Sequence, residues 1–344
     1  MSGDEQRQGE AQGAQNASNP PNARDAEGAS ATPSATAADP GGPLRARQIE
    51  AQGLADEPPE APLPTRRGLR PFVRRLVKHR PAFVGLCLVL LFVGAAALGL
   101  VFEIQDVRHA SPEPFHPPSL EHPFGTDTQG HDMFVLVCRG AVASLLVATL
   151  AVLIAVFIGV PLGVVAGYFG GWIDLVLGRI IDVMMTFPSL VLALTIVMLT
   201  GQSLKNITIA VGVVGAPLFA RQVRASVLVI RSQDYVTAAR ALGFRRIRIL
   251  FGAVLPNCLT PILVLATLGI GTAILDVAGL SFLGLSGDPS LPEWGLMLQL
   301  NQNDFAQYPW VVLAPGIAIF LTVLGFNLFG DGLRDLLDPQ GRRR

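Results

Sequence analysis

The chain has 344 residues, of which 50% are hydrophobic and 15% are charged, and its formal net charge is zero. Soluble domains carry about 25% charged residues, so this composition excludes an ordinary soluble protein and predicts one that lies mainly in lipid. A net charge of zero gives no reason to expect nucleic acid as a partner.

Residues 1–65 differ in composition from the rest of the chain. They are rich in Ala, Gly, Pro, Asn, Asp and Glu and contain no aromatic residue. Such a segment cannot bury a core, so we expect a disordered tail, with a role in binding a partner as the alternative. The tail also lacks the charged start and short apolar stretch of a cleavable signal peptide, so the first apolar span should remain in the mature protein.

Six uncharged apolar runs follow the tail, and each is a candidate membrane-spanning helix. Crossing the ~30 Å hydrocarbon layer takes about 20 apolar residues in a helix, which satisfies its own backbone hydrogen bonds. The fourth run is short and contains Pro217, but apolar residues after Arg221 and Arg224 let the helix continue while both arginines reach towards the headgroups. The expected spans are 81–102, 140–173, 183–204, 206–220, 249–275 and 305–330.

Charges between the spans predict the orientation of the chain. Residues 66–80 form a basic juxtamembrane segment without an acid, residues 103–139 are mainly acidic, and the loop after the fourth span is basic again. Because basic loops stay in the cytoplasm, we expect 103–139 to be extracytoplasmic and both termini, including residues 331–344, to be cytoplasmic. Trp294, Tyr308 and Trp310 lie where an outer aromatic belt is expected.

The chain lacks the motifs of several enzyme classes. Its two lysines, Lys78 and Lys205, do not follow a glycine-rich turn, so no P-loop of the Gly-Lys-Ser/Thr type is present, and we expect no catalytic residue and no bound cofactor. His116 and His122 with Glu121 could hold a metal, but exposed loop histidines are the favoured interpretation and no metal is expected.

Ionisable residues are scarce within the expected spans. No Asp, Glu or His lies in mid-span, and Arg179, Asp182 and Asp276 lie only near span ends. This pattern disfavours an ion-coupled secondary transporter, which remains the main alternative function. A membrane anchor or receptor that transports nothing is a second alternative. Asp276 is a candidate pathway residue, although a solvated or hydrogen-bonded helix end is the simpler interpretation.

The cytoplasmic loop 231–257 is the most informative part of the sequence. Residues 235–243 read Tyr-Val-Thr-Ala-Ala-Arg-Ala-Leu-Gly, which favours a short helix that Gly243 can end in a left-handed conformation. A basic second helix and then Leu255-Pro256 follow. An ordinary interfacial helix would have the same residues, so composition alone does not assign a role.

The spacing of these residues resembles the EAA loop of bacterial ABC-importer permeases. Ala238-Ala239 precedes Gly243 by four residues and Leu255-Pro256 follows twelve residues later, while Thr237 stands at the position of the motif's glutamate. In that family the loop carries a coupling helix that docks on the ATPase. The resemblance implies an ATPase-coupling role for Tyr235, Thr237, Ala238, Ala239, Gly243, Leu255 and Pro256.

Further strings resemble the dipeptide, oligopeptide and nickel branch of this family over about residues 70–340. They are Phe124-Gly-Thr-Asp127 with Gly130-His-Asp132, the AGYFGGWID string at 166–174, Phe187-Pro188, LSFLGL at 280–285, PEWGLML at 292–298 and NLFGDGLRDLLDP at 327–339. Independently of the resemblance, a tight turn after the second span is indicated by Gly167, Gly170 and Gly171.

The resemblance implies an all-α integral membrane protein with six transmembrane helices. One peripheral span, 81–102, would precede a type I ABC importer core, 140–330, that carries the cytoplasmic coupling loop. It further implies a permease subunit for di- or oligopeptides in a bacterial inner membrane. The implied partners are a second homologous permease, one or two ATPases that carry ATP and Mg, and an extracytoplasmic substrate-binding protein.

Overall fold

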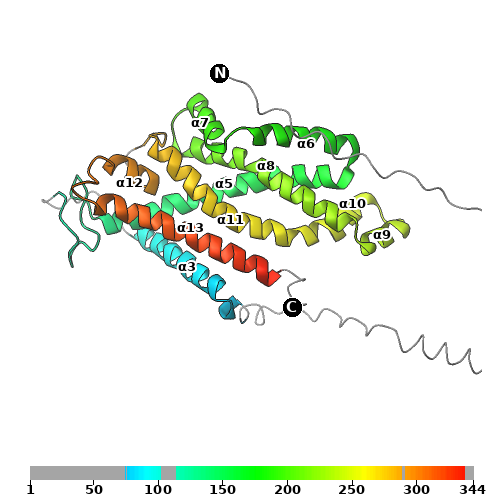
Figure 1. Cartoon of the computed structure of the whole chain (residues 1–344), viewed down its shortest axis with the longest axis horizontal. Helices are drawn as coiled ribbons and strands as arrows, with labels where there is room; N and C mark the ends of the chain where they lie inside the picture. The colour runs from blue at the N-terminus through cyan, green and yellow to red at the C-terminus, as the bar shows by residue number, and fades with distance from the viewer. Residues whose placement is uncertain (1–73, 75, 102–113, 289–290, 338–344) are drawn as a thin grey trace, which may run out of the picture. The chain divides into compact units, whose positions relative to one another are not determined.

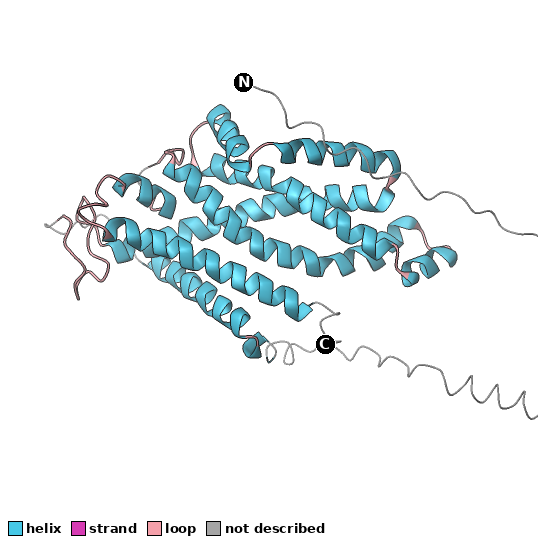
Figure 2. Cartoon of the chain, in the orientation of Figure 1, coloured by secondary structure: helices cyan, strands magenta, loops and turns pink. Residues whose placement is uncertain are grey.

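The computed structural model describes residues 74, 76–101, 114–288 and 291–337. Within these ranges the chain is helical, with one isolated β-bridge between Thr126 and Asp132 and no named strand (Figure 2). The expected disordered tail, most of the basic segment 66–80, residues 102–113 and the C-terminal arginines lie outside the described residues.

Five helical segments of the described chain are long and apolar enough to cross a membrane. They are α3 (Arg80–Val101), α5 (Met133–Phe169), α8 (Leu204–Arg231), the segment Arg246–Phe282 and α13 (Trp310–Leu337). α6 (Gly171–Thr186) and α7 (Ser189–Thr200) make a sixth crossing if they count as one broken span. The predicted all-α membrane fold is confirmed, and α8 continues past Arg221 and Arg224 as expected.

The third predicted span, 183–204, is wrong as a continuous helix. α6 ends at Thr186, Phe187 is extended (φ −86°, ψ 138°), and α7 leaves at 89° to α6. Pro188 explains the break, because its ring disfavours a helical conformation at the preceding residue and it has no N–H to donate.

α5 and α8 run parallel and form the most extensive helix pair of the described bundle. Three glycines at four-residue spacing line the contact: a Cβ on Gly159 or Gly163 would collide with a backbone carbonyl of α8, and one on Gly167 would press on Val227. Small residues at this spacing let transmembrane backbones approach closely. Gly167 therefore belongs to a helix interface, whereas Gly170 and Gly171 have positive φ values and form the predicted turn.

α3 is the most peripheral of the five candidate spans, with only 17% of its apolar window buried. It packs antiparallel to α13 and touches the start of α5. The ends of α3 and α13 are linked by His79 Nε2 and Asp335 Oδ2, which lie 3.4 Å apart. One peripheral span beside a helical core is the arrangement that the sequence predicted.

The helix directions give the bundle two distinct ends (Figure 1). The short helices α9 (Asp234–Ala241) and α10 (Arg246–Ile249) lie at one end, which we call the α9 end. α12 (Trp294–Asn301) and residues 114–132 lie at the other, which we call the α12 end. A π-helical turn, Leu250–Val254, joins α10 to α11 (Leu255–Phe282), which runs back towards α12.

A buried polar cluster closes the α12 end. Glu293 is only 1% exposed, and its carboxylate accepts hydrogen bonds from the Gly295 and Leu296 amides and from the Ser144 hydroxyl. Trp294 is fully buried and donates from its ring to the Val137 carbonyl at 3.0 Å. The prediction of Trp294 in an interfacial belt is therefore wrong, because the capped start of α12 holds this ring inside the bundle.

Candidate functional site

The loop between α8 and α11 is anchored to the bundle by one side chain of α9. Val236 is fully buried and is the only buried residue of this helix. It packs into an apolar cluster made by α5, α8 and α11, together with residues of α10 and the π-helical turn. The members of this cluster are Val164, Tyr168, Val223, Val227, Val236, Ile249, Leu250, Val254, Cys258 and Ile262.

The predicted coupling residues of α9 point in two directions. Tyr235, Thr237 and Ala238 are exposed, whereas Ala239 is partly buried against the Val236 cluster. The helix therefore offers one face to a partner and uses the other to bind its own bundle. Ala238 belongs to the free face, and Ala239 contributes mainly to the anchored one.

Gly243 ends α9 in the left-handed conformation that the sequence predicted. Its φ is +77°, and its amide donates to the Arg240 carbonyl at 3.0 Å. The next amide, of Phe244, donates to the Ala239 carbonyl at 3.2 Å. These bonds satisfy carbonyls at the helix end, and a residue with a Cβ would be strained at this φ.

The second half of the loop returns the chain to the bundle. Leu255 and Pro256 begin α11 directly after the π-helical turn, so the helical segment runs on from Arg246 to Phe282. Asn257 Nδ2 donates to the Tyr235 hydroxyl at 3.2 Å and so ties α11 to α9. The structure thus brings the two parts of the motif together across 22 residues of sequence.

Two side chains that the sequence interpretation missed fix the loop to α5. The Tyr168 hydroxyl donates to the Arg246 carbonyl at 2.7 Å, and Arg231 Nη1 donates to the Gly167 and Tyr168 carbonyls, both at 3.0 Å. Arg231 therefore satisfies carbonyls at the end of α5 that the helix itself leaves unpaired. Tyr168 lies in the AGYFGGWID string, which was interpreted only as a turn.

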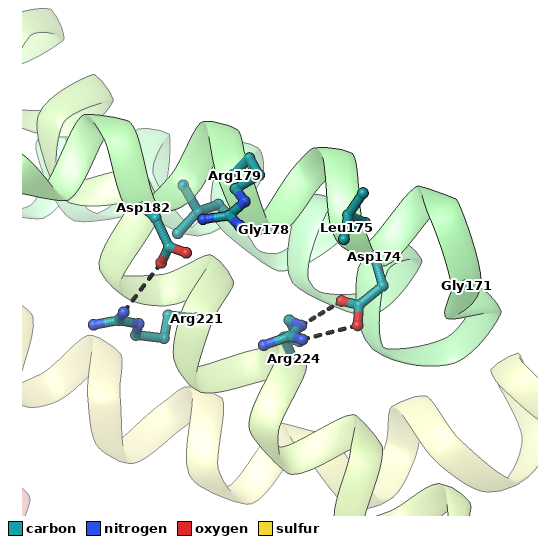
Figure 3. Close-up of a pocket in the computed structure, with 9 residues that line it drawn as sticks. Gly171, Asp174, Leu175, Gly178, Arg179, Asp182, Arg221 and Arg224 are labelled. Carbon is teal, nitrogen blue, oxygen red and sulfur yellow. Dashed lines mark hydrogen bonds and ion pairs between the residues drawn. The ribbon is translucent and has the colours of Figure 1, made fainter.

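Ion pairs join α6 to α8 beside a cavity of about 390 Å³. Arg224 binds both carboxylate oxygens of Asp174, and Arg221 Nη2 lies 3.1 Å from Asp182 Oδ1 (Figure 3). The sequence interpretation had both arginines reach towards headgroups and did not include these pairs, in which carboxylates on the neighbouring helix hold both guanidinium groups. This pairing offsets much of the cost of placing four ionised groups on membrane helices.

Asp276 lies far from the coupling residues along α11. Twenty residues separate it from Pro256, which corresponds to about 30 Å of helix. Its side chain is partly buried and has no hydrogen bond or ion pair within the described part of the chain. The structure therefore separates the two predicted sites, with the coupling residues at the α9 end and Asp276 towards the α12 end.

Of the candidate metal ligands His116, His122 and Glu121, the structure pairs His122 with a carboxylate outside that set, and a second histidine–carboxylate pair lies nearby. His122 Nδ1 lies 3.0 Å from Asp132 Oδ2, and His131 Nδ1 lies 3.0 Å from Asp127 Oδ2. Among the described residues, no group of three or more His, Cys, Asp or Glu side chains is placed to hold a metal ion. These pairs brace the loop before α5.

Comparison with known families settles the class of the protein. Residues 159–343 match the family described as the inner membrane component of binding-protein-dependent transport systems. The chain belongs to this family. The permease is therefore the membrane subunit of an ABC importer, and ATP hydrolysis belongs to separate ATPase subunits of such systems.

Relatives of this permease cover most of its length. The dipeptide transport system permease protein DppC of Alkalihalophilus pseudofirmus is 44% identical over 268 residues, covering 78% of this chain and 88% of that protein. The glutathione transport system permease protein GsiD of Salmonella typhimurium is 42% identical over 280 residues, covering 79% of this chain and 90% of that protein.

A solved structure shares the helical fold. An inward-facing form of the MetNI methionine ABC transporter has a chain that aligns with this one at a TM-score of 0.52 and 19% identity. The alignment covers 60% of this chain and 98% of the MetNI chain. At this identity the likeness supports the fold alone. It agrees with the predicted type I importer architecture.

Proposed function

We propose that this permease forms half of the translocation pathway of an importer for di- or oligopeptides and docks on an ATPase through the exposed face of α9. Both termini and the α9 end face the cytoplasm in this proposal. The α12 end faces the substrate-binding protein, and a second homologous permease completes the pathway.

One observation carries the coupling assignment: α9 is a short helix at the end of the bundle that is anchored by one fully buried side chain and exposes its opposite face. Large apolar side chains gather on this loop, with Leu242 77% exposed and Ile247 66% exposed. Exposed apolar groups of this kind at the water-facing end of a bundle favour a protein partner.

The anchoring contacts suggest how motion would pass into the membrane. Val236 and the Asn257–Tyr235 hydrogen bond attach α9 to α11, and Arg231 and Tyr168 attach the same loop to α5. Closure of the ATPases would pull on α9 and move these helices together. ATP and Mg would be bound by the ATPases, and this chain would bind no cofactor.

The peptide cargo is supported by the relatives, which are named for dipeptide and glutathione transport. Asp276 is proposed as a pathway residue, because its carboxylate has no partner within the described chain and lies on a membrane helix. A cationic peptide N-terminus is a suitable transient partner for it. Asp276→Asn should slow uptake without changing the amount of permease in the membrane.

Reconstitution separates this proposal from the ion-coupled alternative. The permease would be coexpressed with candidate partner permease and ATPase subunits, and dipeptide uptake into proteoliposomes would be measured with a binding protein present. Uptake should need hydrolysable ATP on the ATPase side and should persist after ionophores collapse ion gradients. Uptake driven by an ion gradient without ATP would refute the proposal.

A further inference from the structure

A cavity of about 440 Å³ lies at the α9 end, between the last residues of α5 and the α9–α10 loop. Aromatic rings and arginines line it together, and none of its lining residues is a carboxylate. The rings belong to Tyr168, Phe169 and Phe244, and the guanidinium groups to Arg231, Arg240 and Arg246.

Within the described residues, no ion pair or hydrogen bond to a carboxylate neutralises the arginines of this cavity. Arg231 donates to two carbonyls of α5, which carry no net charge. Arg240 and Arg246 have no side-chain hydrogen bond or ion pair in the described part of the chain. The carboxylate of Asp174, on the helix that follows α5, is already held by two hydrogen bonds from Arg224. The cavity therefore has the charge of an anion site that no described carboxylate fills.

The geometry of α8 places this cavity at the level of lipid headgroups. α8 has 28 residues, which span about 42 Å as a helix and match the roughly 40–45 Å of a bilayer with its headgroup regions. Arg231, its last residue, then lies at the membrane surface. Trp172, 74% exposed just after α5, is an aromatic residue of the kind enriched at that surface. Basic pockets between helices at this level suit anionic headgroups.

We propose that this cavity binds the phosphate of an anionic phospholipid of the cytoplasmic leaflet, with Arg240 and Arg246 as the principal donors. The orientation of the cavity and the ATPase-facing role of the loop rest on the proposed function, whereas the anion site itself does not. Because the cavity joins α5 to the α9–α10 loop, a bound headgroup holds that loop against the bundle. Anionic lipid thereby fixes the position of the surface that is offered to the ATPase.

Native mass spectrometry of the purified full chain in detergent tests this proposal. The probes are phosphatidylglycerol, phosphatidylcholine and inorganic phosphate, each titrated into the same preparation. The single Arg240→Gln and Arg246→Gln variants and their combination are compared with Arg245→Gln, which removes a charge from the same loop but does not line the cavity. Arg231 is left intact because it also caps α5.

The unaltered chain and Arg245→Gln should retain phosphatidylglycerol in preference to phosphatidylcholine. The double variant should retain it on the order of tenfold or more less tightly, since two charges near the headgroup are lost. Equal retention by all variants would refute the site. Displacement of the lipid by inorganic phosphate at equal concentration would show a free-phosphate site instead.

A protein partner is the competing occupant, and the same variants distinguish it. Loss of ATPase association by the double variant in detergent without anionic lipid, with phosphatidylglycerol retention unchanged, would assign the cavity to the ATPase and overturn the proposal. Ala238→Glu should keep lipid retention while losing ATPase binding. If the coupling assignment fails, the lipid-retention measurement can therefore still be interpreted.

Discussion

Glu293 is the residue whose environment differs most from what its position in the sequence suggested. It lies between the fifth and sixth predicted spans, yet its carboxylate is buried and accepts three hydrogen bonds at the start of α12. A buried carboxylate is stable only when its oxygens are satisfied in this way. Its role is to fix α12 on α5, with Ser144 as the shared contact.

Replacing this carboxylate should therefore weaken the α12 end. Glu293→Ala leaves two amides and one hydroxyl without their acceptor, at a cost of about 1–3 kcal/mol for each unsatisfied group. We expect a lower thermal midpoint of the detergent-solubilised permease and less protein in the membrane. Leu120→Ala, at a fully exposed position of the neighbouring loop, is the control. An unchanged midpoint in Glu293→Ala would show that the cap contributes little.

At the scale of elements, the sequence predicted the membrane helices well and their contacts poorly. Hydropathy identifies a span because lipid contact depends on composition, so α3, α5, α8, α11 and α13 could all be expected. The break at Pro188 has a local cause that hydropathy does not detect. The burial of Trp294 depends on how helices pack, which composition does not encode.

The candidate loop shows the same division between local and distant contacts. The left-handed Gly243 was predictable because its cause is local. The hydrogen bonds of Tyr168 and Arg231 were not predictable from the sequence, since they join residues more than 60 positions apart.

The α5–α8 interface gives a prediction at this scale. Gly163→Leu should force the two backbones apart, since a side chain there meets the Ala220 carbonyl and Val223, and overpacking typically costs about 1–3 kcal/mol. The amount of folded permease should fall, as measured by fluorescence size-exclusion chromatography. Gly94→Leu, at a position with nothing within 4 Å, should leave it unchanged. Equal profiles for both variants would argue against close packing at Gly163.

The whole molecule has two ends of different character, and the charge pattern predicts which faces the cytoplasm. In a background without Cys87, Cys138 and Cys258, Leu120→Cys should react with an impermeant thiol reagent in intact cells. Ser232→Cys should react only after the membrane is opened. Both positions are exposed, so access to the reagent depends on the side of the membrane. The opposite labelling would reverse the orientation.

Coupling to an ATPase is the central claim for the molecule as a whole, and copurification of the ATPase with the Ala238→Glu variant tests it most directly. A glutamate on the exposed face of α9 must lose water against the docked partner, whereas the Val236 anchor inside the bundle is untouched. Leu120→Glu is the matched control, because it adds the same charge at an exposed site on the opposite end of the bundle.

The two variants should reach the membrane in normal amounts. Ala238→Glu should retain on the order of tenfold less ATPase, or lose substrate-stimulated ATP hydrolysis, while Leu120→Glu should behave as the unaltered permease does. Normal ATPase retention together with normal hydrolysis and uptake in Ala238→Glu would contradict the assignment of α9 as the coupling helix.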